Sequence, residues 1–164
     1  MRADQDADAF DGRNETIAER SDRNWGDILQ ELRVTQTGTQ IISGFLLTVA
    51  FQQRFPLLKL SELGVYLALI SLAAASTILG LSIVSLHRTQ FHRHEKPEIV
   101  AIASRLLIVS TVIVAVLTVG VLFFIFDFVL GVAAGLAAGV VGVLLAGYLL
   151  FVLPRSAIPR RPKD

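Results

Sequence analysis

The pattern of hydrophobic positions predicts four membrane-spanning helices. Three long apolar segments cover residues 63–86, about 99–126 and 128–153. Each is long enough to supply the ~20 apolar residues that a helix needs to cross a ~30 Å hydrocarbon core. A weaker segment covers about 34–51, and only residues 41–51 of it are mostly apolar. We therefore predict an all-α, polytopic membrane protein with four transmembrane helices.

A tight turn is expected between the last two spans. Asp127 is the only charged residue between Leu106 and Leu153. So long a stretch exceeds one span, so the chain must fold back near the sequence FDFVLG, residues 126–131. Unpaired backbone groups are costly in lipid, which places this turn at the interface. Asp127 is then interpreted as a turn residue that caps the fourth span, and a proton-holding carboxylate is the alternative.

The segments that flank the spans are polar. Residues 1–24 are acidic with little to bury, and we expect a disordered cytoplasmic tail. Residues 25–32, WGDILQEL, have apolar side chains at helical spacing and predict a short interfacial amphipathic helix anchored by Trp25. Residues 155–164 form a basic tail. The predicted membrane domain is therefore 25–154.

Composition agrees with a membrane protein and excludes several functions. The 164 residues are 53% hydrophobic, above the ~45–50% that is typical of soluble domains, and the mean hydropathy is +0.61. The net charge of +1 gives no basic field that would attract nucleic acid. The absence of cysteine excludes disulfides, thiolate metal sites and cysteine catalysis.

Lys and Arg residues predict the orientation. They are frequent in the two tails and between spans two and three, whereas the segment between spans one and two has only Arg54 and Lys59. Basic residues favour the cytoplasmic side of bacterial membranes. We therefore expect a multi-pass protein of the plasma membrane, the bacterial inner membrane, with both termini in the cytoplasm.

Polar side chains follow one face of the first predicted span. The stripe consists of Arg33, Gln36, Thr37, Gln40, Ser43 and Thr48. One hypothesis makes it the wet wall of an ion or solute path. The other assigns it to interhelical hydrogen bonds, worth ~0.6–2 kcal/mol each. The second is favoured because four short spans leave little room for a pore in one monomer.

Small residues form one face of the fourth predicted span. Gly131, Gly135, Gly139 and Gly142 recur at helical spacing. Small residues let helix backbones approach closely, which is a main source of helix association in lipid. This pattern predicts a packing surface, and its partner is either a span of the same chain or another copy.

Basic residues near the membrane surface are candidate contacts to lipid headgroups. These are Arg88, Arg93 and Arg105. Arg105 is expected to extend to the cytoplasmic headgroups or to pair with Glu31, and participation in transport is the alternative. His87, His92 and His94 lie nearby, but their spacing fits no zinc pattern, so a solvated loop is favoured over a metal site or a pH sensor.

Catalytic patterns are missing from the sequence. It has no Gly-rich phosphate loop, no Ser-His-Asp set and no paired carboxylates within reach of each other. No carboxylate lies near the middle of a predicted span, where a proton-coupled exchanger usually needs one. We expect no catalytic residue, no metal and no cofactor, and therefore not an enzyme.

Three stretches carry a family resemblance. ILQELRVTQTGTQIISGFLLTVAFQQRF, VYLALISLAAASTIL and HRTQFHRHEK together resemble a family of small actinobacterial four-helix membrane proteins of uncharacterised function. Its members are often automatically labelled sodium:proton antiporter. The resemblance covers roughly residues 25–126 and implies the four-span topology and an actinobacterial membrane.

Three functional hypotheses remain. The leading one is a non-enzymatic structural or accessory subunit that self-associates through the fourth span. The alternative is a cation or proton transporter, antiporter-like, in which the polar faces of several copies enclose a route. The third is a lipid-binding module that uses Arg88, Arg93 and Arg105. The expected partners are membrane lipids and either a second copy or another membrane protein, with no nucleic acid.

Overall fold

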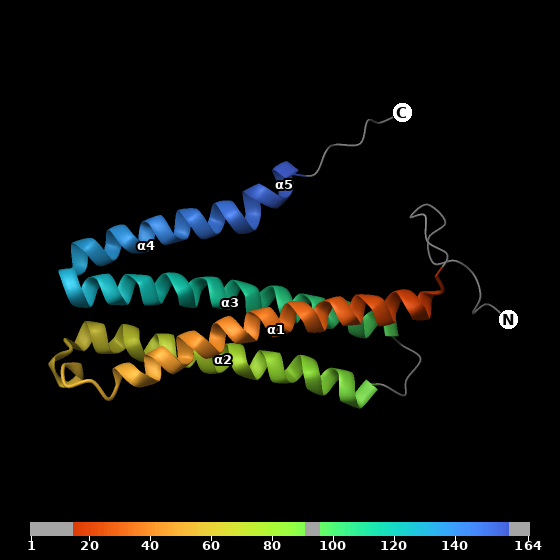
Figure 1. Ribbon diagram of the computed structural model, residues 1–164, viewed down its shortest axis with the longest axis horizontal. Helices are drawn as coiled ribbons and strands as arrows, with labels where there is room; N and C mark the ends of the chain where they lie inside the picture. The colour runs from red at the N-terminus through yellow and green to blue at the C-terminus, as the bar shows by residue number, and fades with distance from the viewer. Residues whose placement is uncertain (1–14, 91–95, 158–164) are drawn as a thin grey trace. The chain divides into compact units, whose positions relative to one another are not determined.

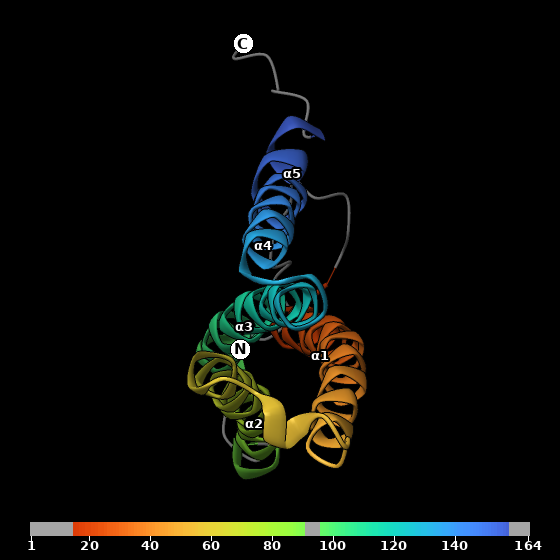
Figure 2. The same cartoon turned by 90° about the vertical axis from the view of Figure 1, so that its left-hand side faces the viewer.

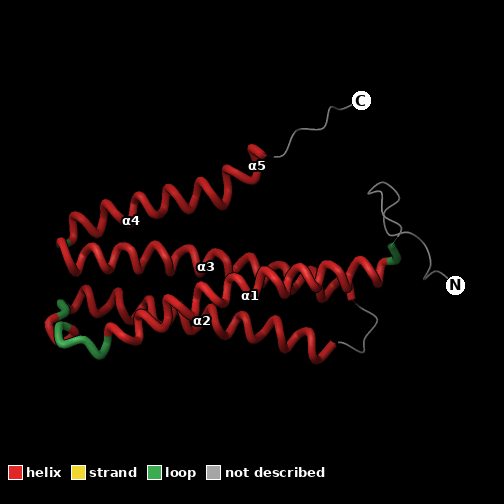
Figure 3. The backbone as a smooth tube through the Cα atoms, viewed as in Figure 1, coloured by secondary structure: helices red, strands yellow, loops and turns green. Residues whose placement is uncertain are grey.

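The fold is all-α, as predicted. The computed structural model describes residues 15–90 and 96–157, and Figure 3 shows that helices account for nearly all of them. The elements in chain order are α1 Ile17–Val49, the 3₁₀ turn η1 Phe55–Leu57, α2 Leu60–Gln90, α3 Lys96–Leu130, α4 Val132–Gly147, the π-helical turn η2 Tyr148–Val152 and α5 Leu153–Ala157. Residues 1–14, most of the expected amino-terminal tail, lie outside the described residues.

Three helices are long and apolar enough to cross a membrane. Within the described residues these segments are Leu60–Leu86, Glu98–Leu130 and Val132–Ser156. They correspond to the second, third and fourth predicted spans, and they support a membrane protein. α1 is not among them, because the polar side chains that precede Ile41 lower its mean hydropathy. The predicted first span therefore stays a prediction.

Helices α1, α2 and α3 each bury one seam of residues at alternating steps of three and four. In α2 the buried positions are Glu62, Tyr66, Leu69, Ala73, Ser76, Gly80 and Ile83. In α3 they include Ala103, Leu107, Ser110, Leu117 and Phe124. In α1 they include Ser21, Trp25, Ile28, Leu32, Thr39 and Leu46. A repeat of 3.5 residues keeps one face toward a neighbouring helix, as in coiled coils.

The chain divides into two compact units. The first contains residues of Met1–Ser43 and Ala73–Val114, and the second contains residues of Gly44–Leu72 and Ala115–Asp164. The first unit has an aliphatic and aromatic core that joins α1, α2 and α3. Its buried members are Trp25, Ile28, Leu32, Ile83, Ala103 and Leu107.

Trp25 corrects one prediction about the amino-terminal segment. Residues 25–32 are part of the continuous helix α1 and do not form a separate interfacial helix. The side chain of Trp25 is only 8% exposed, and it packs in the core of the first unit. The interpretation of Trp25 as a headgroup anchor was therefore wrong. The amphipathic pattern was real, but its apolar side faces helices of the same chain.

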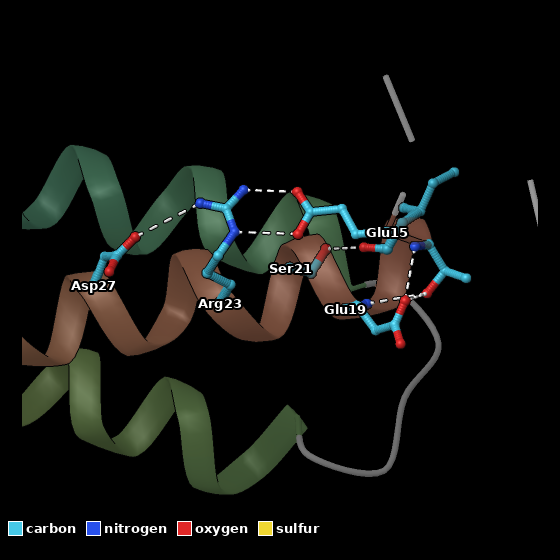
Figure 4. A network of polar contacts seen from close by, with 7 residues as sticks. Glu15, Glu19, Ser21, Arg23 and Asp27 are labelled. Carbon is cyan, nitrogen blue, oxygen red and sulfur yellow. Dashed lines mark hydrogen bonds and ion pairs between the residues drawn. The ribbon is translucent and has the colours of Figure 1, made fainter. Parts of the chain in front are cut away.

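A capping box starts α1 inside the segment for which we expected a tail. The Thr16 backbone N–H donates to the Glu19 carboxylate at 2.8 Å, and the Glu19 N–H donates to Thr16 Oγ1 at 3.3 Å. Figure 4 shows these bonds beside the ion pair of Arg23 with Glu15. In this pair Arg23 Nη2 lies 2.8 Å from Glu15 Oε1. The bonds satisfy amide groups that a helix end leaves unpaired.

In the second unit, α1 and α2 are joined by residues 50–59, which Figure 2 shows end-on. Tyr66 of α2 donates its hydroxyl to the Leu46 carbonyl of α1 at 3.0 Å, which satisfies an acceptor near the end of that helix. The Tyr66 ring contacts Phe55 edge-on, with ring centroids 5.1 Å apart, and Phe124 at 6.1 Å. These contacts fix the connection against α2 and α3.

The reversal between α3 and α4 occurs at Gly131. This residue has a φ of 96°, a conformation that L side chains rarely adopt, and it is the N-cap of α4. Asp127 lies one turn earlier, inside α3, and its carbonyl accepts the Gly131 N–H at 2.8 Å. The turn was predicted in the right segment. The assignment of Asp127 as the cap of the fourth span was wrong, because glycine supplies the reversal.

Candidate functional site

A buried polar cluster links α1 and α2 in the first unit. The hydroxyls of Thr39 and Ser76 are 3.2 Å apart, and both residues are 0% exposed. Gln36 donates from Nε2 to the Ser76 carbonyl at 3.0 Å. Gly80, one turn further along α2, leaves the space that the Gln36 amide occupies. We call Gln36, Thr39 and Ser76 the polar cluster.

The polar cluster includes only one residue of the predicted stripe, Gln36. Thr37, Ser43 and Thr48 donate their hydroxyls to carbonyls four residues earlier in α1 itself. The side chains of Arg33, Thr37, Gln40 and Thr48 are exposed. The stripe is therefore split between two faces of α1, and the structure does not bring its six residues together.

Sequence reasoning missed Thr39 and Ser76 as a pair. Both lie on heptad seams of their helices, and this spacing would have found them. Ser110 occupies a similar position on α3 of the same unit and is 0% exposed. Its Oγ atom has no hydrogen-bond partner among the described residues. A buried hydroxyl without a partner costs about 1–3 kcal/mol.

The glycine face of α4 packs on α3 of the same chain. Figure 1 shows α4 folding back beside the carboxyl-terminal part of α3. A Cβ atom added at Gly135 would lie 2.8 Å from the Cβ of Asp127, and one at Gly139 would lie 3.6 Å from the Cβ of Phe123. One at Gly142 would lie 3.2 Å from Val119. The packing surface predicted from the glycines therefore lies against the preceding helix of the same chain. Packing against another copy was the alternative.

The basic and histidine candidates do not form a site in the described part of the chain. Arg88 and Arg105 are exposed, and Arg93, His92 and His94 lie outside the described residues, as does the side chain of His87. The expected pair of Arg105 with Glu31 is not formed. No group of three potential metal ligands occurs within residues 15–90 and 96–157.

Glu62 is a buried carboxylate that the sequence analysis did not consider. It is 6% exposed. Its Oε2 accepts the Lys59 N–H at 2.8 Å, and its Oε1 lies 3.4 Å from Lys59 Nζ. Both contacts are with the residue that precedes α2. Glu62 therefore serves to begin that helix, as Glu19 does for α1.

A cavity of about 440 Å³ in the second unit was not predicted. We call it the Arg54 groove. Residues from the end of α1, the following segment and the end of α3 line it, among them Phe45, Val49, Gln52, Arg54, Phe124 and Phe128. The guanidinium carbon of Arg54 lies 4.9 Å from the centroid of the Phe128 ring. The sequence signal for this groove was the polar FQQRF segment that separates two apolar stretches.

Comparison with known proteins gives a family. Residues 14–154 match an uncharacterised family described as "Family of unknown function (DUF6328)". The chain belongs to this family. No curated protein and no solved structure matches the chain. Membership in DUF6328 agrees with the uncharacterised family expected from the sequence, while the actinobacterial origin and the antiporter label stay predictions.

Proposed function

We propose that this DUF6328 protein is a non-enzymatic structural or accessory subunit of the bacterial inner membrane. The observation that supports this role is the use of the polar cluster. Thr39 and Ser76 bond to each other, and Gln36 bonds to the α2 backbone. The bonds of Ser76 with Thr39 and with Gln36 join α1 to α2, and in lipid a bond between helices is worth ~0.6–2 kcal/mol.

The placement of acidic residues also favours this proposal over proton exchange. The sequence has no acid between Glu31 and Glu62, and Asp127 is the only one between Glu98 and Asp164. Glu62 is engaged by Lys59 at the start of α2. A carboxylate that binds and releases protons in mid-membrane would have to come from elsewhere.

We extend the proposal to four spans with both termini in the cytoplasm. Leu46 in the apolar half of α1 is fully buried, and its carbonyl accepts the hydroxyl of Tyr66 in α2. This half therefore packs beside α2, one of the long apolar helices. The distribution of Lys and Arg then sets the orientation.

An accessory subunit needs a surface for its partner, and α4 supplies one. Its glycine face is occupied by α3, so self-association through those glycines is replaced by association through the exposed side of the helix. Large apolar side chains are exposed there, including Leu136, Val140, Val143 and Leu144. In the membrane such a face contacts lipid, a second copy or another membrane protein.

Ion flux tests the proposal. The purified protein is reconstituted in liposomes, and proton and sodium flux are recorded under an imposed gradient. We expect flux equal to that of protein-free liposomes, with helicity and insertion verified in the same sample. Flux well above this background would contradict the structural role.

A cation or proton transporter is the second candidate, and the exposed side chains of Arg33, Thr37, Gln40 and Thr48 favour it. They could line a route only between copies, because they do not face the core. Gln40→Leu would then abolish flux, while Gln36→Leu, which alters a residue bonded to α2, would lower stability without removing the route. If neither variant changes a measured flux, this route is wrong.

A further inference from the structure

We propose that the Arg54 groove binds one anionic phospholipid, with an acyl chain against its aromatic floor and the headgroup phosphate on the Arg54 guanidinium. The proposed site does not use Arg88, Arg93 or Arg105, the headgroup contacts that the sequence suggested. It does not depend on the accessory role proposed above. The argument rests on the lining, the charge and the place of the groove in the chain.

The lining suits an acyl chain. The floor consists of Phe45 and Val49 from α1 and of Phe124 and Phe128 from α3. The Phe124 and Phe128 rings stack with centroids 6.3 Å apart and an interplanar angle of 12°. The volume of about 440 Å³ falls in the ~300–1,000 Å³ range of pockets that hold small molecules. Polar atoms are confined to the side chains of Gln52, Gln53 and Arg54 and to the backbone.

The charge of the groove suits a phosphate. Arg54 is exposed and makes no ion pair within the described residues, and its contact with the Phe128 ring holds the guanidinium over the groove. A guanidinium presents a planar fork of donors that matches phosphate oxygens. The neighbouring cation Lys59 differs, because its Nζ lies 3.4 Å from the Glu62 carboxylate. Arg54 is therefore the positive charge left for a ligand.

The place of the groove favours a lipid over a soluble anion. The groove lies where α1 ends, and α2, an apolar helix long enough to span, begins a few residues later at Leu60. The polar residues Gln52, Gln53 and Arg54 therefore lie at the junction between hydrocarbon and headgroups. A phospholipid at this depth offers both an acyl chain and a phosphate, whereas free phosphate offers nothing to the aromatic floor.

Thermal unfolding in a non-ionic detergent tests the inference. The protein is titrated with short-chain phosphatidylglycerol, with phosphatidylcholine of the same chains, and with inorganic phosphate. We expect only phosphatidylglycerol to raise the Tm, in a saturable manner. Arg54→Gln should weaken the apparent Kd about tenfold or more, because a charge-assisted contact is lost. Lys59→Gln removes the same charge from the same segment and should retain the response.

A second variant addresses the space for the acyl chain in the groove. Val129 lines the groove and is exposed, so Val129→Trp should fill the acyl site without disturbing the core. It should reduce the response to phosphatidylglycerol as Arg54→Gln does. The inference is overturned if phosphatidylcholine or inorganic phosphate raises the Tm equally. It is also overturned if Arg54→Gln responds like the unaltered protein, or if Lys59→Gln loses the response to the same extent.

Discussion

At the scale of single residues, a buried hydroxyl stabilises or destabilises the fold according to whether it has a hydrogen-bond partner. Ser76 bonds to Thr39, whereas the Ser110 hydroxyl has no partner among the described residues, although both side chains are fully buried. The sequence predicted interhelical hydrogen bonds from the polar stripe, whose hydroxyls bond within α1 instead, and Gln36 is the stripe residue that bonds to α2. The sequence could not rank Ser76 against Ser110, because that difference depends on which side chain lies opposite each residue.

The two serines give a matched prediction for stability. Ser76→Ala should lower the free energy of unfolding by about 1 kcal/mol, since it breaks an interhelical hydrogen bond. Ser110→Ala should raise it by a similar amount, because it removes a buried hydroxyl that lacks a partner. Thermal unfolding of both variants in one detergent measures the difference. Equal destabilisation by the two variants would show that Ser110 has a partner after all.

Glu19 gives a prediction about pH. The hydrogen bond from the Thr16 backbone N–H, followed by that from the Thr16 side chain, lowers the pKa of Glu19 below its ordinary value of 4.5. A lowered pKa means that the folded state favours the carboxylate. The contribution of this cap is therefore fully present above about pH 4.5 and is lost as the pH falls through the lower, folded pKa.

Amide hydrogen exchange in the first turn of α1 measures this effect. Exchange at residues 16–20 should accelerate as the pH falls below 4.5, beyond the change in the intrinsic rate. Glu19→Gln should remove most of that pH dependence. A Glu19→Gln variant with the same profile as the unaltered protein would assign the effect to another group.

At the scale of elements, the apolar segments were predictable and their ends were not. Continuous apolar stretches of more than 20 residues located α2, α3 and α4. The ends depend on local contacts such as the capping box of Thr16 with Glu19, the positive φ of Gly131 and the Glu62 carboxylate at the start of α2. The inward face of α1 was predicted wrongly. The prediction assigned it to a stripe of polar residues, whereas the buried face is a heptad seam that contains both apolar and polar residues.

A disulfide tests the packing of α4 on α3. The chain has no cysteine, and the 3.6 Å from the Phe123 Cβ to a Cβ placed at Gly139 lies within the ~3.5–4.5 Å span of disulfide-bonded Cβ atoms. Phe123→Cys combined with Gly139→Cys should therefore oxidise within one chain. The control is Phe123→Cys with Val141→Cys, because Val141 is exposed. Disulfide-linked dimers from the first pair would instead place the glycines between copies.

At the scale of the whole molecule, the number of membrane crossings depends on α1. The described residues contain three helices that satisfy length and composition, and α1 would be the fourth. The sequence could not settle this, since the polar first half of α1 lowers its hydropathy while its apolar half resembles a span. The parity of the spans determines whether the two ends of the chain lie on the same side.

Labelling of single cysteines with a membrane-impermeant maleimide measures that parity. Asp22→Cys and Ser156→Cys should both stay unlabelled in intact cells and react after permeabilisation. Gln53→Cys, an exposed position between α1 and α2, should react in intact cells. Labelling of Asp22→Cys and Ser156→Cys on opposite sides would mean three crossings, with α1 outside the hydrocarbon core.

The bond between Thr39 and Ser76 also determines the register of α1 against α2. Heptad seams of aliphatic residues tolerate sliding by seven positions, because one layer of leucines resembles the next. In these seams Thr39 lies seven residues from both Leu32 and Leu46, and Ser76 lies seven from both Leu69 and Ile83. A slip of one heptad would leave each hydroxyl facing an aliphatic layer. The polar cluster thus specifies the register of the two helices, since the native register pairs the hydroxyls and a register shifted by one heptad leaves them unpaired.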